Sequence, residues 1–450
     1  MSVTSNKNTM KAQVRSRRAL LIAFHFPPQA ASSGIQRTLS FSRHLGKHGW
    51  EPLVLSAHPR AYSQQNPSQL ASVPPELVVK RVFALDTKRH MGIKGRYLGV
   101  MALPDRWLSW WLGAVPAGVS LIRRHKPEVI WSTFPIATAH LIGLTLHRLT
   151  RLPWVADFRD PMLQATYPGS RLQRTFYKWI EYQTITRCSM AVFTTQSALT
   201  SYRERFPHIP ASKFVVIENG YDEDGFDMAS VARQASMPAA DRRVTLLHSG
   251  VLYQTGRDPS AFLQALSVLK QDGRVDAARL RVVLRAPGDA NHVTALVQKY
   301  GVADVVEVAP PIPYREALQE MMSADGLMVF QGSAFNTQVP AKIYEYFRAR
   351  KPILGLLDTT GETAHVLRDA GFHSLAQMNL SEAIVPVLSQ FIELIARGEA
   401  HVATSELVAA SSRAHRASQL AEVLQLALSG RAGEPVSEQS EPDVSASGSR

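Results

Sequence analysis

The sequence predicts an α/β protein with two doubly wound parallel-sheet domains. Short apolar runs of strand length alternate with helix-length segments, which is typical of parallel sheets covered by helices on both faces. The pattern restarts once, after a polar stretch near residues 220–242. The chain has 450 residues, of which 45% are apolar and 19% are charged. This length and composition are sufficient for two domains with cores of ordinary size.

The expected strands fall into two groups along the chain. Those of the first group are residues 19–26, 51–57, 128–134, 153–158, 190–195 and 213–218. Those of the second group are residues 244–250, 280–286, 305–309, 326–332 and 351–357.

The strands and the polar stretches also predict the domain boundaries. We expect a disordered basic arm at 1–18, an N-terminal Rossmann-like domain at 19–225, a linker at 226–242, a C-terminal Rossmann-like domain at 243–404, a terminal helix at 405–428 and a disordered tail at 429–450.

Charge and cysteine content limit the classes of partner and site. The net charge of +13 favours an acidic partner, either phosphate groups, an anionic membrane or nucleic acid. Nucleic acid is the weakest candidate, because no recognition motif is present and five of the charges lie in the basic arm. The single cysteine, Cys188, excludes a disulfide framework and fits a reducing compartment such as the cytoplasm. No cysteine or histidine spacing indicates a metal site.

An apolar, aromatic segment raises the question of a membrane. Residues 107–122 carry no charge but fall short of the ~20 residues that span a bilayer. Five of the seven tryptophans lie between Trp107 and Trp154, with a basic run at 123–126 among them. We expect these residues either to dock on an anionic membrane surface or to pack in the core.

Candidate site residues follow the strands of the first group. The carboxyl ends of parallel strands form the ligand crevice of an open α/β sheet, so polar residues there are expected to meet. Gly34 and Arg37 open the helix after the first strand, where a close backbone approach and unpaired N–H groups suit an anion. Arg159 and Asp160 follow the fourth strand. The alternatives are a plain strand–helix loop at Gly34 and a structural Arg–Asp pair near Asp157.

The second group of strands offers a comparable set. Gly250 and Arg257 follow its first strand, and Arg285 with Gly288 follows the next. An arginine in a loop at the carboxyl end of a strand can clamp a phosphate, although an exposed arginine is usually only solvated.

The segment NTQVPAKIYEYFRARKPIL, residues 336–354, carries the densest pattern. Pro340 is expected at the first position of a helix, with Lys342 in the first turn and Glu345 on the same face. A phosphate on the helix N-terminus, a lysine beside it and a carboxylate one turn deeper would hold the diphosphate and ribose of a nucleotide. The alternative is an exposed Lys–Glu pair on a helix surface.

These segments together resemble the family 4 glycosyltransferases of the GT-B fold, and most of all the bacterial branch called glycosyltransferase 4-like. The resemblance extends over about residues 19–428 and rests on FHFPPQAASSGIQR, WSTFP, PWVADFRDPM, ENGYD, HSGVLYQTGRDP and PAKIYEYFRARKPIL. It implies two Rossmann-like domains that face each other across a cleft, the N-terminal one on the acceptor side and the C-terminal one binding the nucleotide sugar. It also implies metal-independent transfer of a sugar, with retention of configuration, from a nucleoside-diphosphate sugar that is the co-substrate, with no further cofactor.

The resemblance also assigns roles to the candidate residues. By it, Gly34 would face the donor diphosphate, Arg257 and Lys342 would neutralise it, and Glu345 would bind the ribose as the second glutamate of an E-x7-E motif. We therefore expect Arg159, Asp160, Arg257 and Lys342 as catalytic residues, and as donor-binding residues Gly34, Arg37, Gly250, Arg285, Pro340 and Glu345.

Two positions depart from the family pattern. Thr337 stands where the first glutamate of E-x7-E is expected, and Arg159 stands where many members have a histidine. The expected protein is a glycosyltransferase of cell-surface polysaccharide biosynthesis, cytoplasmic or peripheral on the inner face of the plasma membrane, with a lipid-linked or glycan acceptor. The alternatives are a nucleotide-sugar-binding protein without turnover and a sugar-nucleotide epimerase on the same fold.

Overall fold

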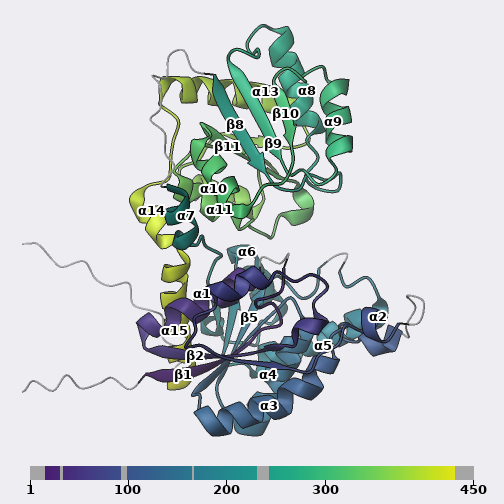
Figure 1. The fold of residues 1–450 in the computed structure, drawn as a ribbon, viewed down its shortest axis with the longest axis vertical. Coiled ribbons are helices and arrows are strands. Elements are labelled where there is room, and N and C mark those ends of the chain that lie inside the picture. Colours follow the sequence, from purple (N-terminus) through teal and green to yellow (C-terminus); the bar gives the residue numbers. More distant parts are fainter. Residues whose placement is uncertain (1–15, 31–33, 93–98, 165–166, 231–242, 431–450) are drawn as a thin grey trace, which may run out of the picture.

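The computed structural model describes residues 16–430 apart from 31–33, 93–98, 165–166 and 231–242. Two domains, each built on one sheet, lie one above the other along the long axis of the molecule (Figure 1). The predicted fold class, two doubly wound α/β domains, is confirmed. Most of the predicted arm, linker and tail lies outside the described residues.

The N-terminal sheet has seven parallel strands in the order β3-β2-β1-β4-β5-β6-β7. Its central strands are apolar on both faces, because helices cover each side. The strands are β1 (Arg17–Ile22), β2 (Trp50–Ala57), β3 (Val78–Val82), β4 (Val129–Thr133), β5 (Trp154–Arg159), β6 (Met190–Phe193) and β7 (Phe214–Val216).

Two helical layers enclose this sheet. On one face, a core cluster joins the sheet to α3 (Ser109–His125), α4 (Ala137–Thr150), α5 (Arg171–Arg187) and α6 (Gln196–Arg205). On the other face, a second cluster joins it to α1 (Gly34–His44) and α15 (Arg413–Ser429). The short α2 (Thr87–His90) lies in the connection between β3 and α3.

The C-terminal sheet has six parallel strands in the order β10-β9-β8-β11-β12-β13. The strands are β8 (Val244–Ser249), β9 (Leu280–Arg285), β10 (Val306–Ala309), β11 (Gly326–Gln331), β12 (Ile353–Leu357) and β13 (Leu375–Gln377). Helices α8 (Ser260–Gln271), α9 (Ala290–Lys299) and α13 (Ser381–Arg397) pack on one face. The other face carries α10 (Tyr314–Ser323), α11 (Lys342–Ala349) and α12 (Glu362–Asp369).

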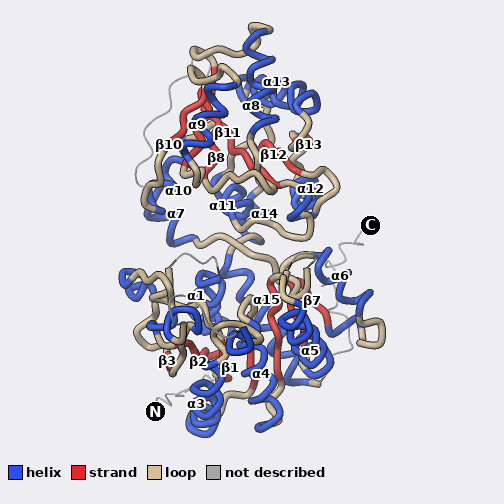
Figure 2. The backbone as a smooth tube through the Cα atoms, turned by 90° about the vertical axis from the view of Figure 1, so that its right-hand side faces the viewer, coloured by secondary structure: helices blue, strands red, loops and turns tan. Residues whose placement is uncertain are grey.

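The two sheets have the same topology, and this places the site. In each sheet, the first three strands are added in one direction from the centre and the later strands in the other. The strand order therefore reverses between β1 and β4 and between β8 and β11. Ligands of open α/β sheets bind at such switch points, outside the carboxyl ends of the strands. The loops that follow these strands face the gap between the two domains in both views (Figures 1 and 2).

The C-terminal end of the chain crosses back to the N-terminal domain. Helix α14 (Ser405–Ala410) packs against the C-terminal domain, whereas α15 buries its stripe of Ala417, Leu420 and Leu424 against the N-terminal sheet. The single helix predicted at 405–428 is therefore wrong in one respect, because it is interrupted at residues 411–412. There the backbone turns from one domain to the other, and Arg413 N donates to Tyr221 O on the outgoing crossing segment, at 2.9 Å.

Every predicted strand is present, but the structure adds two and moves other boundaries. Strands β3 and β13 lie at the edges of their sheets, where short and partly exposed strands give a weak apolar pattern. Strand β1 begins at Arg17, inside the predicted arm, because Arg17 and Arg18 continue its pairing with β2. Helix α7 (Glu223–Ser230) occupies the start of the predicted linker, because Phe226 is buried against the C-terminal core.

The tryptophans between Trp107 and Trp154 pack inward. Trp110, Trp131 and Trp154 are completely buried, and Trp107 and Trp111 pack against the same domain's core. Of the two alternatives for these tryptophans, the structure favours core packing, because their rings fill the space around β4 and β5. No helix in the described part of the chain has both the length and the apolar character needed to cross a bilayer.

Candidate functional site

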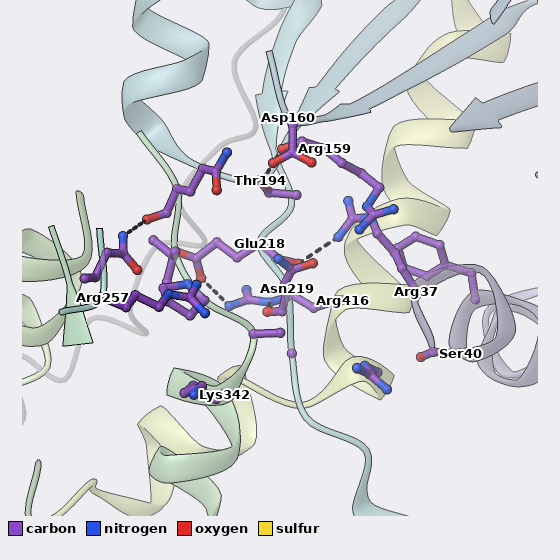
Figure 3. Close-up of a pocket in the computed structure, with 18 residues that line it drawn as sticks. Arg37, Ser40, Arg159, Asp160, Thr194, Glu218, Asn219, Arg257, Lys342 and Arg416 are labelled. Atoms are coloured by element: carbon purple, nitrogen blue, oxygen red, sulfur yellow. Dashed lines mark hydrogen bonds and ion pairs between the residues drawn. The ribbon is translucent and has the colours of Figure 1, made fainter. Parts of the chain in front are cut away.

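A cavity of about 430 Å³ lies between the two domains, as the topology predicts. Arg257 and Lys342 approach it from the C-terminal domain, and Arg37, Arg159 and Asp160 from the N-terminal domain (Figure 3). The full lining is Arg37, Ser40, Phe41, Arg159, Asp160, Thr194, Glu218, Asn219, Gly220, Arg257, Gln331, Gln338, Val339, Pro340, Ala341, Lys342, Arg413 and Arg416.

Arg37 is held by the protein itself. Its Nε and Nη2 atoms donate to the two oxygens of Asp157 at 3.0 and 2.8 Å, and both side chains are buried. Its Nη1 and Nη2 atoms also donate to the carbonyl oxygens of Glu218 and Ile217, each at 3.0 Å. Four of its five N–H groups are thus already used. Arg37 therefore fixes the wall of the cavity and has little capacity left for a ligand.

Arg159 and Asp160 project from the end of β5. The backbone of Arg159 is left-handed, with φ of 53°, and Thr194 donates a hydrogen bond to its carbonyl oxygen. Burial lowers the pKa of the Arg159 guanidinium and raises the pKa of the Asp160 carboxyl, while the proximity of the two opposes both shifts. Asp157 forms its ion pair with Arg37, whereas Arg159 and Asp160 line the cavity.

Gly34 is needed at its position because Arg159 lies against it. A Cβ atom there would come within 2.4 Å of Arg159 Nη1 and 2.8 Å of His25 Nδ1. Burial and the Arg159 charge lower the pKa of His25 to about 3, so this ring is neutral at physiological pH. Gly34 therefore makes room for Arg159, a cation of the cavity wall. The sequence had instead predicted that Gly34 faces the ligand itself.

Arg257 lies against two aromatic rings, Tyr253 and Phe335, which contact each other edge to face with their ring centres 6.1 Å apart. Its guanidinium carbon lies 5.5 Å from the ring centre of Tyr253 and 5.6 Å from that of Phe335. Gly256, at φ of 140°, allows the Phe335 ring to approach, since a Cβ atom there would lie 2.6 Å from it. The Nε atom of Arg257 is buried and has no hydrogen-bond partner among the described residues. Its contacts with the two rings thus position the guanidinium at the cavity.

Lys342 lies at the first position of α11 and reaches back to β8. Its Nζ atom donates to Ser249 O at 2.8 Å. Gly250, at φ of 139°, leaves the space for it, because a Cβ atom there would lie 2.6 Å from Nζ. Burial, and then the charge of Arg257, lower the pKa of Lys342 to about 8. Pro340 lines the cavity, but α11 begins two residues later. The prediction that Pro340 is the first residue of the helix is therefore wrong.

The charges around the cavity do not balance. Arg37 is paired with Asp157, Arg416 with Glu218, and Arg413 lies 3.8 Å from Asp222. By contrast, no carboxylate within the described part of the chain lies within 4 Å of Arg257 or Lys342. Arg257 and Lys342 thus form a positive side of the cavity, to which Arg159 adds a third cation whose charge is offset by that of the neighbouring Asp160.

Four predicted residues do not line the cavity: Gly34 and Gly250, which lie against Arg159 and Lys342, and Arg285 and Glu345. Arg285 forms a bidentate pair with Glu320 and also donates to Pro310 O, which accounts for its guanidinium. Glu345 accepts a hydrogen bond from Tyr314 at 2.8 Å. Glu345 still lies on α11 close enough to raise the pKa of Lys342 slightly, so it stands at the margin of the cavity.

Several lining residues were missed by the sequence reasoning. Arg413 and Arg416 come from the terminal helix, whose return to the N-terminal domain no local pattern indicates. Glu218, Asn219 and Gly220 belong to the ENGYD segment, which was recognised but given no role.

Gln331 at the end of β11 was also missed. Its Nε2 atom donates to Phe335 O, Gln338 O and the Thr363 hydroxyl, at 2.9, 2.7 and 2.9 Å. Its Oε1 atom is buried and has no partner among the described residues. A buried amide whose donor is occupied and whose acceptor is free offers a fixed hydrogen-bond acceptor to a ligand.

The two domains are also joined beside the cavity. Glu362 at the start of α12 accepts hydrogen bonds from the backbone N–H groups of Gln196 and Ser197, at 2.8 and 3.2 Å. A carboxylate at a helix N-terminus is favourable, because the orphan N–H groups there carry partial positive charge. Thr195 donates to Thr337 O at 3.1 Å, so the backbone of Thr337 joins the domains while its side chain is exposed.

Comparisons with known proteins identify the fold. Residues 33–220 match the family model described as a glycosyl transferase 4-like domain. No curated protein sequence matches the chain significantly.

Solved structures that resemble the chain share its two-domain fold at low identity. Sucrose-phosphate synthase from Thermosynechococcus elongatus aligns with a TM-score of 0.55 and 12% identity, over 92% of this chain and 97% of that one. HepE of Anabaena in complex with UDP gives 0.58 and 13%, over 91% and 99%. UDP-GlcNAc 2-epimerase from Neisseria meningitidis bound to UDP-GlcNAc gives 0.51 and 11%, over 91% and 99%. The chain thus has the GT-B fold. The predicted resemblance to glycosyltransferase 4-like proteins is confirmed for residues 33–220.

The Arg37–Asp157 pair yields a direct test of what Arg37 does. Arg37→Ala leaves a buried carboxylate without its partner, so the N-terminal domain should lose about 3–5 kcal/mol of unfolding free energy. The seven tryptophans all lie between Trp50 and Trp179, so tryptophan fluorescence during urea unfolding reports on that domain.

Arg43→Ala on the same helix is the matched control, because its ion pairs are less buried and should contribute about 1 kcal/mol or less. An Arg37→Ala protein of unchanged stability that no longer binds a nucleotide sugar would show that Arg37 is a ligand-binding residue, as the sequence predicted.

Proposed function

We propose that this protein is a glycosyltransferase that moves a sugar from a nucleoside-diphosphate donor to a hydroxyl group of a lipid-linked or glycan acceptor. The premise is the glycosyl transferase 4-like domain at residues 33–220 within a GT-B fold. HepE was solved with UDP and with UDP-glucose, which supports a donor of this chemical class.

The observation that carries the proposal is the pair of uncompensated cations, Arg257 and Lys342. Both line the cavity. Arg257 lies in the loop after β8 and contacts two aromatic rings, whereas Lys342 lies at the start of α11 and donates to Ser249 O at the end of β8. Helix N-termini and fixed cations together attract phosphate groups. A nucleoside-diphosphate sugar carries one negative charge on each phosphate, so its diphosphate would compensate these cations.

The same two cations have a task in the reaction. Transfer breaks the bond between the anomeric carbon and the diphosphate oxygen, and the acceptor oxygen forms the new bond and loses its proton. Negative charge grows on the departing diphosphate, so cations already in position stabilise the transition state more than the ground state. We propose that they do so without a metal, and that the configuration at the anomeric carbon is retained, as the family resemblance implies.

Asp160 and Gln331 are our candidates for contacts with sugar hydroxyl groups. Both line the cavity, from opposite domains, and each carries a side-chain oxygen. The pKa of Asp160 is raised by burial, which suits a carboxyl that shares a proton with a hydroxyl group. Arg159, where many family members have a histidine, would then hold Asp160 in place.

Two other functions are distinguished by their products. An epimerase would change the donor sugar in the absence of any acceptor, and no histidine is among the described residues that line the cavity to exchange a proton at carbon. A binding protein without turnover would hold the donor and leave it intact. A transferase releases the nucleoside diphosphate faster when its acceptor is present.

A donor screen tests the proposal. Thermal unfolding with UDP-, GDP-, ADP- and dTDP-sugars should identify one that raises the melting temperature. At a hundredfold excess over its Kd, that donor should add about 2.7 kcal/mol to the free energy of unfolding. Lys342→Met should abolish the shift, because one of the two cations is removed.

Lys299→Met is the matched control, since Lys299 is an exposed lysine on α9 outside the cavity lining and its replacement should leave the shift intact. If no nucleotide sugar stabilises the protein, or if both variants respond like the wild type, the donor assignment is wrong.

The lowered pKa of Lys342 predicts that donor binding weakens as the pH rises. Only the protonated amine attracts the diphosphate, and with a pKa of about 8 its protonated fraction falls from about 0.9 at pH 7 to about 0.1 at pH 9. Donor affinity should therefore fall about tenfold between pH 7 and pH 9, as titration calorimetry measures.

The Lys342→Met protein should bind weakly and show no such slope. The same slope in that variant would assign the pH dependence to another group.

A further inference from the structure

The outer face of α5 is an exposed apolar stripe that plays no part in the cavity. Leu172, Phe176, Trp179 and Tyr182 are 52, 39, 46 and 50% exposed. Intervals of four, three and three residues place them on one side of the helix, over a length of about 15 Å. We call these four residues the α5 face. Of the seven tryptophans, Trp179 alone is exposed.

Basic side chains border the α5 face. The helical spacing puts Arg171 and Lys178 along one border and Arg187 along the other, and all three are exposed. The only carboxylate of α5, Glu181, is buried and paired with Arg205. The face therefore combines an apolar centre with a positive border and has no negative charge on its helix that faces solvent.

The end of α4 extends this surface. Gln183 Oε1 on α5 accepts hydrogen bonds from Arg148 Nη2 of α4 and from Arg187 Nε, each at 2.8 Å. This contact brings a second exposed arginine to the C-terminal end of the α5 face. Leu149, beside Arg148, is 62% exposed. Figure 1 shows α4 and α5 as neighbours on the N-terminal domain.

We propose that the α5 face docks this protein on an anionic lipid bilayer. Tryptophan and tyrosine favour the membrane interface, where their rings meet the acyl chains and their polar atoms stay at the headgroups. Lysine and arginine beside them attract anionic headgroups. A helix of this kind lies in the plane of the interface with its apolar side inserted. A second copy of the chain fits the face less well, because it would bring the same positive border against this one.

The position of α5 connects this surface to the cleft. Ten residues separate Asp160 in the cavity wall from Arg171 at the start of α5. Docking by the α5 face would hold the N-terminal domain, which forms the acceptor side of the cleft, at the membrane where a lipid-linked acceptor resides. This consequence rests on the proposed function, whereas the docking itself does not, because vesicle binding requires neither donor nor acceptor.

Flotation with lipid vesicles tests the inference on the full chain. The wild type should float with vesicles made of equal parts phosphatidylglycerol and phosphatidylcholine, less with phosphatidylcholine alone, and less at high salt. Phe176→Ser with Trp179→Ser should lower the partition coefficient about tenfold or more. Brominated phosphatidylcholine, which quenches only tryptophan in contact with the acyl region, should quench the wild type but not a Trp179→Phe variant.

Phe83→Ser with Leu380→Ser is the matched control, because these side chains are 43 and 42% exposed and lie outside α5. It should bind vesicles like the wild type, and near-equal melting temperatures would show that both double variants fold. The inference is wrong if the wild type does not float, or if the α5 variant floats as well as the control. It is also wrong if sedimentation shows a dimer that the α5 substitutions dissociate, since the face would then join two copies.

Discussion

Arg37 and Asp157 meet out of contact with water, and their pairing positions most of what surrounds the cavity. Arg37 comes from α1 and Asp157 from β5, and Thr133 at the end of β4 donates to the same carboxylate at 2.7 Å. Arg37 also binds the carbonyls of Ile217 and Glu218, where the chain leaves the N-terminal domain. A buried ion pair contributes little net stability, but losing one partner is costly. Its contribution here is geometric, because four separate segments are held at one point.

The chemistry of the cavity then depends on glycines that give space to cations. Gly34 admits the Arg159 guanidinium, and Gly250 admits the Lys342 amine. Each cation is desolvated as a result, which lowers the pKa of both groups and strengthens their attraction for an anion in a medium of low polarity. The protein therefore holds positive charge in a place where a diphosphate can compensate it. The crossing of the chain and the return of α15 close the same cavity from the side.

The sequence predicted the parallel sheets and the cleft, because apolar runs and strand-end loops are local signals. The structure adds what long-range packing decides. Arg37 was predicted to bind the donor, and its ion-pair partner Asp157 lies 120 residues away along the chain. Arg413 and Arg416 enter the cavity because α15 packs on a domain that its sequence position does not indicate. The burial of the tryptophans around β4 could not be predicted for the same reason, since aromatic composition does not show which side chains are buried.

Hydrogen–deuterium exchange with a stabilising nucleotide sugar tests most directly whether the cleft between the domains is the donor site. The account predicts slower exchange in two parts of the C-terminal domain, residues 249–257 and 338–345, and in the crossing segment 218–220, because these line or support the cavity. Protection confined to surfaces outside the cleft, with 338–345 exchanging as fast as in the free protein, would contradict it.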